Sequence, residues 1–205
     1  MSADADPAEA APPPPPPPVL VADALLATGA RGVVFGPVSL RVAPGELVAL
    51  VGPGGSGRTS LLLALAGRFA LTAGRVEVAG DVAIARAGAL LDLDERWTVG
   101  EAIAQRALLS HRPPARVAGL ASALALHALT PLQRALLDVA LAAGEGRPVI
   151  VMDDVDRGLT PDDEAQVWRA LAELRDVAVV GVTTDAAPAR AAGATVLALA
   201  EAARA

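Results

Sequence analysis

The stretch Glu46–Leu63, ELVALVGPGGSGRTSLLL, decides the fold of this chain. It begins with an apolar run, Leu47–Val51, that predicts a strand buried on both faces. Four glycines within the segment Gly52–Gly57 allow the backbone to turn sharply and to approach a ligand closely. The Leu/Ala run Leu61–Ala66 predicts a buried helix that ends at Gly67. A strand, a glycine loop and a helix in this order form a phosphate-binding cradle.

The glycine loop follows the pattern G-x-x-x-x-G-K-[ST] except at one position. Gly52, Gly57 and Thr59 satisfy the pattern, and Arg58 occupies the lysine position. All 17 basic residues of the chain are arginines, so a compositional bias accounts for part of this difference. A plain strand-to-helix turn is the alternative interpretation, but the flanking strand and helix favour phosphate binding.

The composition excludes several classes of protein. The 205 residues suffice for one good-sized domain, and 53% of them are hydrophobic. A net charge of −6 and the absence of a basic stripe argue against nucleic-acid binding. Because cysteine is absent, disulfides and thiolate metal sites are excluded. The apolar runs are too short or too interrupted to span a bilayer, and the acidic N-terminus does not resemble a signal peptide, so we expect a soluble, cytoplasmic protein.

The chain divides into a tail and a domain. Residues 1–18 contain seven consecutive prolines, Pro12–Pro18, which favour an extended helix that cannot join a core. We expect a disordered, Pro-rich tail, more plausibly a solvated spacer than a ligand for a proline-binding module. The domain is expected over residues 19–205.

The pattern of the domain is that of an α/β protein. Val19–Leu26 and Val33–Val42 predict an antiparallel pair of strands with one face in water. The other expected strands are Arg75–Ala79, Val82–Ala85, Val149–Met152, Val177–Val182 and Thr195–Leu199. A helix is expected over Thr98–Leu109, with Thr98 and Glu101 as a capping box. A second is expected over Leu132–Ala143 after the cap Thr130, and a third from Thr160 onwards. Alternating strands and helices predict a mainly parallel sheet covered on both sides.

Two acidic residues, Asp153 and Asp154, follow the apolar run Val149–Met152, which predicts a second buried strand. A phosphate loop needs a divalent cation, which the Thr59 hydroxyl and the Asp153 carboxylate can hold. Asp154 can then orient or deprotonate an attacking water. A solvated pair of acids at a strand end is the alternative, which the glycine loop upstream makes the weaker one. His111 and His127 have no companion ligand at metal-binding spacing, and we expect both at the surface.

In these features the sequence resembles the nucleotide-binding domain of ATP-binding cassette (ABC) proteins. Gly52–Leu62 is similar to the family's Walker A motif, and Leu129–Arg134 lies where its signature motif precedes Walker B. Val149–Asp154 resembles Walker B, Arg157–Thr160 the D-loop, and Val179–Asp185 the strand that ends at the switch histidine.

The resemblance implies a P-loop NTPase fold with an N-terminal antiparallel part and a helical subdomain reduced to 97–130. It also implies Mg-ATP as the ligand. The residues expected at the nucleotide are Gly52, Pro53, Gly54, Gly55, Ser56, Gly57, Arg58, Thr59, Ser60, Thr130 and Gln133, with Thr59 and Asp153 on the metal and Asp154 as the catalytic carboxylate that acts on the water. A membrane-embedded permease subunit and a homo- or heterodimer of cassettes are the implied partners, which would place the chain at the inner face of the cell membrane.

The family's catalytic positions differ in this sequence one after another. Arg58 replaces the Walker A lysine, Asp154 the catalytic glutamate and Thr184 the switch histidine. Pro131 and Leu132 replace the signature glycines, and Pro131 cannot donate a backbone hydrogen bond. Thr160 replaces the D-loop aspartate, no glutamine occurs between Ala85 and Trp97, and no tyrosine is available to stack on adenine.

These differences favour an ATP-binding subunit with weak or lost hydrolysis. A fully active transport ATPase and a scaffold cassette that binds no nucleotide are the alternatives. A small-molecule kinase of the same P-loop class fits less well, because it does not explain the block from Leu129 to Gly158.

Overall fold

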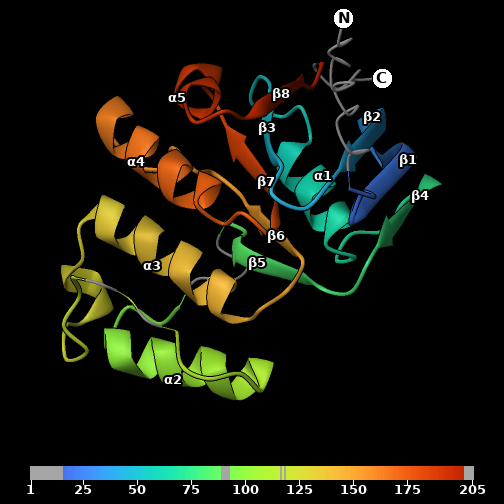
Figure 1. The fold of residues 1–205 in the computed structure, drawn as a ribbon. Coiled ribbons are helices and arrows are strands. Elements are labelled where there is room, and N and C mark those ends of the chain that lie inside the picture. Colours follow the sequence, from blue (N-terminus) through green and yellow to red (C-terminus); the bar gives the residue numbers. More distant parts are fainter. Residues whose placement is uncertain (1–15, 89–92, 116, 118, 201–205) are drawn as a thin grey trace, which may run out of the picture.

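The computed structural model describes residues 16–88, 93–115, 117 and 119–200, which form two β-sheets with helices around them (Figure 1). The larger sheet has the order β5-β6-β7-β3-β8, and all its strand pairs are parallel, as the sequence predicts. Its strands are β5 (Val82–Arg86), β6 (Val149–Met152), β7 (Ala178–Thr183), β3 (Leu47–Val51) and β8 (Thr195–Ala198).

Alternate residues of the central strands enter two different cores. On β3, Val48 and Leu50 pack in one core, whereas Leu47 and Ala49 pack in the other. The first core also contains helix α1 (Arg58–Leu65) and the antiparallel sheet, and the second contains α3 (Pro131–Gly144), α4 (Pro161–Ala172) and α5 (Ala186–Ala191). The predicted burial of β3 on both faces is therefore confirmed, and both faces of the parallel sheet are covered.

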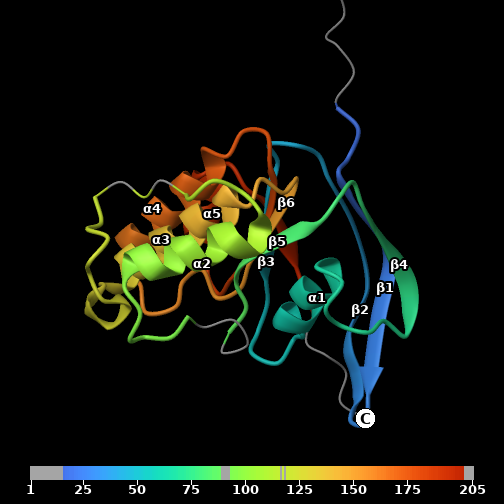
Figure 2. The same cartoon turned by 90° about the horizontal axis from the view of Figure 1, so that it is seen from below.

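The smaller sheet lies beyond α1 and has the order β2-β1-β4 (Figure 2). Strands β1 (Leu20–Gly29) and β2 (Gly32–Val42) form the expected antiparallel pair. Strand β4 (Ala73–Val78) pairs with the other edge of β1, although β5 follows it closely in sequence and belongs to the parallel sheet. The chain thus changes sheets between β4 and β5.

Helix α2 (Val99–Ser110) lies on the outer side of α3, away from the parallel sheet (Figures 1 and 2). The capping box of Thr98 and Glu101 is present as predicted. A third small core, which includes Val99, Leu126 and Leu137, joins α2, the 3₁₀ turn Leu126–Ala128 and α3. None of the described helices is long and apolar enough to cross a membrane.

Candidate functional site

The glycine loop joins the carboxyl end of β3 to the start of α1. The helix begins at Arg58, before the predicted start at Leu61. Its first turn was not predicted, because the residues of that turn are polar and show no hydrophobic period. Its N-cap is Gly57, with a φ of 79° and no side-chain cap hydrogen bond. Among the described residues, no acceptor binds the N–H groups of Arg58, Thr59 and Ser60. These donors and the helix dipole make the loop a cradle for an anion.

Two of the glycines are required by close backbone contacts. A Cβ atom on Gly57 would lie 2.2 Å from the Val34 carbonyl oxygen, and one on Gly52 would lie 2.8 Å from the Leu199 carbonyl oxygen. Gly54, in contrast, faces open space. Ser56 is buried, its N–H donates to the Pro53 carbonyl, and its hydroxyl lies on the Gly52 side of the loop without a hydrogen-bond partner among the described residues.

Arg58 reaches from the loop to the end of the neighbouring strand β7. Its Nη1 donates to the Thr183 carbonyl oxygen at 2.7 Å. The buried Thr183 hydroxyl in turn donates to Glu164 of α4 at 2.7 Å. Part of the guanidinium that stands in the lysine position is therefore already bound to the protein.

Asp153 lies at the carboxyl end of β6 and is only 1% exposed. Burial raises its pKa, and the charge of Asp154 adds to this, whereas the neighbouring Thr59 side chain and the charge of Arg58 oppose it. Thr59 lies on α1, which follows β3, and Asp153 follows β6. The fold thus brings the two residues together although β7 lies between β3 and β6 in the sheet. A buried carboxylate beside a hydroxyl suits Mg²⁺, which prefers oxygen ligands.

The turn after β6 holds Asp154 in a left-handed conformation with a φ of 43°. Its carbonyl oxygen accepts hydrogen bonds from Arg86 Nη1 at 3.3 Å and from the Arg157 N–H at 3.0 Å. Asp156 of the same turn accepts hydrogen bonds from the N–H and the hydroxyl of Thr184. The residue in the switch position is therefore tied to the turn.

Thr130 and Gln133 lie at the start of α3, and their polar groups satisfy each other. The Gln133 N–H donates to the Thr130 hydroxyl at 3.2 Å, and the Thr130 N–H donates to Gln133 Oε1 at 3.0 Å. Within the described residues, no hydrogen bond joins either of them to the glycine loop. They form a capping box, which the sequence analysis recognised only as a cap at Thr130.

Arg86 and Asp156 also lie at this site, although their sequence positions did not predict it. An arginine that ends an otherwise apolar strand was the available signal for Arg86, which is 7% exposed. Asp156 gave no such signal, because it is one of several acids in a polar turn. The described residues contain no group of three or more His, Cys, Asp or Glu suited to a metal, and His111 and His127 are exposed as expected.

The comparisons with known proteins agree with this geometry. The sequence profile of the ABC transporter family matches residues 35–178. The zinc import ATP-binding protein ZnuC 2 of Hahella chejuensis is 34% identical over 152 residues, which cover 68% of this chain and 60% of that protein. This chain spans less than two thirds of the length of the curated relatives that it matches.

Solved structures show the same fold. A structure of the ATP-binding subunit of an ABC transporter superposes with a TM-score of 0.70 at 17% identity, covering 88% of this chain and 85% of the other. The ATP-binding cassette MJ0796, in a dimeric post-hydrolysis state bound to ADP and Pi, gives a TM-score of 0.67 at 19% identity, covering 88% and 94%. The chain therefore belongs to the ABC transporter family and is an ATP-binding domain of that family.

Proposed function

We propose that this chain binds Mg-ATP at the glycine loop as the ATP-binding subunit of an ABC-type transporter, with hydrolysis weak or lost. One observation carries the proposal: the uncapped start of α1, with its free N–H donors, adjoins a buried carboxylate. The Thr59 side chain on this first turn lies close enough to Asp153 to lower the pKa of that carboxyl. Such an arrangement has donors for phosphate oxygens and ligands for the cation in one place.

In this proposal the backbone of the loop binds the phosphates. The residues that contribute are Gly52, Pro53, Gly54, Gly55, Ser56, Gly57, Arg58, Thr59 and Ser60. Ser56 contributes by shaping the loop, because its N–H is bound to the Pro53 carbonyl and its buried hydroxyl lies beside Gly52. Thr59 and Asp153 hold Mg²⁺, which when bound neutralises charge on the phosphate oxygens.

The reduced hydrolysis follows from the side chains around the phosphates. Arg58 keeps a positive charge, but its planar fork is partly committed to the Thr183 carbonyl. Asp154 is one methylene shorter than a glutamate and holds a water less favourably for attack. The Thr184 hydroxyl donates to Asp156 and has no second proton to offer a phosphate.

The partners follow from membership of the family alone. We propose a membrane-embedded permease subunit and a second cassette, whose bound nucleotide would face Thr130 and Gln133. Purification from native membranes tests this proposal: recovery with a membrane protein is expected, and recovery only as a free monomer contradicts it.

Equilibrium binding of ATP to the purified chain, with and without Mg²⁺, tests the nucleotide site. We expect saturable binding that Mg²⁺ strengthens, and Thr59→Ala should weaken the Mg²⁺-dependent part about tenfold, which corresponds to roughly 1.4 kcal/mol. Thr195→Ala, at the amino end of β8, is the matched control and should bind like the parent. Absence of binding in the folded parent protein would overturn the proposal and favour the scaffold cassette.

A further inference from the structure

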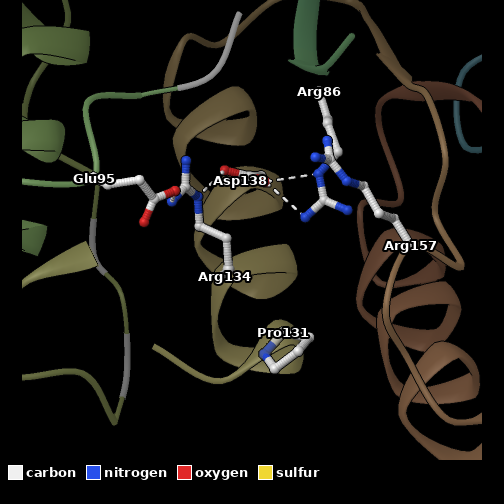
Figure 3. Close-up of a pocket in the computed structure, with 6 residues that line it drawn as sticks. All are labelled: Arg86, Glu95, Pro131, Arg134, Asp138 and Arg157. Atoms are coloured by element: carbon white, nitrogen blue, oxygen red, sulfur yellow. Dashed lines mark hydrogen bonds and ion pairs between the residues drawn. The ribbon is translucent and has the colours of Figure 1, made fainter. Parts of the chain in front are cut away.

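A pocket of about 180 Å³ lies between the end of β5, the start of α3 and the turn after β6. It is lined by Arg86, Glu95, Pro131, Arg134, Asp138 and Arg157 (Figure 3). None of these residues belongs to the glycine loop. Both Pro131 and the turn at Gly158 border this region, since a Cβ atom on Gly158 would lie 3.8 Å from Pro131 Cβ.

The lining carries three guanidinium groups and two carboxylates, in a chain whose net charge is −6. Asp138 Oδ2 is shared by Arg86 Nε at 3.0 Å and Arg86 Nη2 at 2.8 Å. Arg134 Nη1 pairs with Glu95 at 3.0 Å, but 62% of the Glu95 side chain is exposed, so solvent screens that carboxylate. Within the described residues Arg157 forms no ion pair. The pocket therefore holds one uncompensated positive charge.

One wall of the pocket contains a buried nitrogen that has no hydrogen-bond acceptor among the described residues. Arg134 Nε is buried and lies 3.5 Å from Asp138 Oδ1, which is an ion-pair distance but not a hydrogen bond. This nitrogen is closed to solvent, so its nearest partner is the Asp138 carboxylate and not a group within the pocket. Figure 3 shows Arg157 extending from the turn after β6 toward Arg86, so that cationic groups from two elements converge on one cavity.

We propose that this pocket is a binding site for a small oxyanion of the phosphate or sulfate class. Planar guanidinium groups match the oxygens of such an anion bidentately, and the anion would supply the missing negative charge. The Asp154 carbonyl oxygen accepts hydrogen bonds from Arg86 Nη1 and from the backbone N–H of Arg157, so the site adjoins the turn of the proposed catalytic carboxylate. The proposal is independent of nucleotide binding.

Titration of the intact chain with inorganic phosphate, followed by calorimetry and by the side-chain N–H resonances of the arginines, tests this site. Arg157 is exposed, so Arg157→Gln leaves the fold intact. We expect saturable binding in the parent, shifts at Arg86 and Arg134, and a loss of affinity of about tenfold or more in Arg157→Gln. Arg157→Lys should fall between the two, and Arg190→Gln at the end of α5, which removes the same charge elsewhere, should match the parent.

Sodium chloride at matched ionic strength separates a specific site from general screening. Phosphate that binds only at the glycine loop would leave the isotherms of Arg157→Gln and the parent identical, and this result would overturn the proposal. Equal weakening in Arg157→Gln and Arg190→Gln would also overturn it. Mg-ATP binding of the same variants reports on the glycine loop separately, so failure of the nucleotide site and failure of this pocket are distinguishable.

Discussion

At the scale of single residues, Asp153, the proposed metal ligand, is a carboxyl whose burial opposes its charge. Burial raises the pKa of this carboxyl above its ordinary value of 3.8. In the free protein the ionised form is therefore disfavoured in the folded state, and stability is lost as the pH rises through the raised pKa. A bound cation would remove this penalty, which is the expected signature of a metal ligand that is held ready in a buried site.

Asp153→Asn should therefore raise the melting temperature of the nucleotide-free protein at pH 7 to 8. The gain should vanish below about pH 4, where the parent's carboxyl is protonated in both states. About 2–4 °C is expected for each kcal/mol relieved in a domain of this size. Thermal unfolding across pH, together with a loss of Mg²⁺-dependent ATP binding, checks the prediction, and a variant less stable than the parent at neutral pH would contradict it.

If the proposed function is right, replacement of Arg58 and Asp154 should raise ATP turnover above that of the parent. In the double variant Arg58→Lys, Asp154→Glu, a compact ammonium replaces the guanidinium that binds Thr183, and the longer acid comes closer to the water. A positioned general base contributes ~10²–10⁴-fold in rate, so even partial rescue is measurable as phosphate release. Tight Mg-ATP binding without a gain in turnover would place the defect in dimer closure at Pro131 and Leu132 instead.

At the scale of elements, the buried ion pair of Arg86 and Asp138 joins β5 to α3. Arg86 is 7% exposed and Asp138 is 6% exposed. Burial raises the pKa of Asp138, and the charges of Arg86 and Arg134 oppose this shift. Removing one partner leaves the other charge buried without compensation. The pair therefore holds α3 against the parallel sheet. The segment Leu129–Arg134, which overlaps the start of α3, is held with it.

Asp138→Ala should destabilise the protein by about 3–5 kcal/mol. The double replacement Arg86→Met, Asp138→Leu should recover most of this loss, because neither charge of the pair remains buried and Arg134 keeps Glu95 as its partner. Asp81→Ala, which removes a partner of Arg147 at the surface, should stay within about 1 kcal/mol of the parent. Chemical denaturation measures all three, and equal losses in the single and the double variant would show that packing rather than charge governs this contact.

At the scale of the whole molecule, the described chain starts at the outer sheet. Residues 1–15 lie outside the described part, and Pro16–Pro18 are exposed. Deletion of residues 1–18 should therefore leave the melting temperature and the ATP affinity unchanged, since the sequence predicts that this segment buries nothing. Thermal unfolding of the shortened chain beside the parent checks this, and a large loss of stability would reveal a tertiary role for the prolines.

The sequence by itself determined the local structures whose signals are local. The apolar run of β3, the glycines after it, and the caps at Thr98 and Thr130 specified a strand, a loop and two helix starts, all present in the structure. Helix α5 was not predicted, because its six residues, Ala186–Ala191, contain mainly alanine and a proline and carry no hydrophobic period. Local patterning also indicated which strands are buried on both faces, since side chains alternate along each strand.

Only the tertiary structure decided which strands are neighbours. Strand β4 joins β1 rather than β5, and β7 lies between β3 and β6, so that Thr59 meets Asp153 and Arg58 meets Thr183. Arg86 likewise reaches Asp138 across 52 residues of chain. Periodicity specifies the faces of an element but not its partner, because parallel strands are connected by long crossovers and their order depends on the packing of the whole core. The site is therefore formed by residues whose types the sequence displays and whose contacts arise from sheet order.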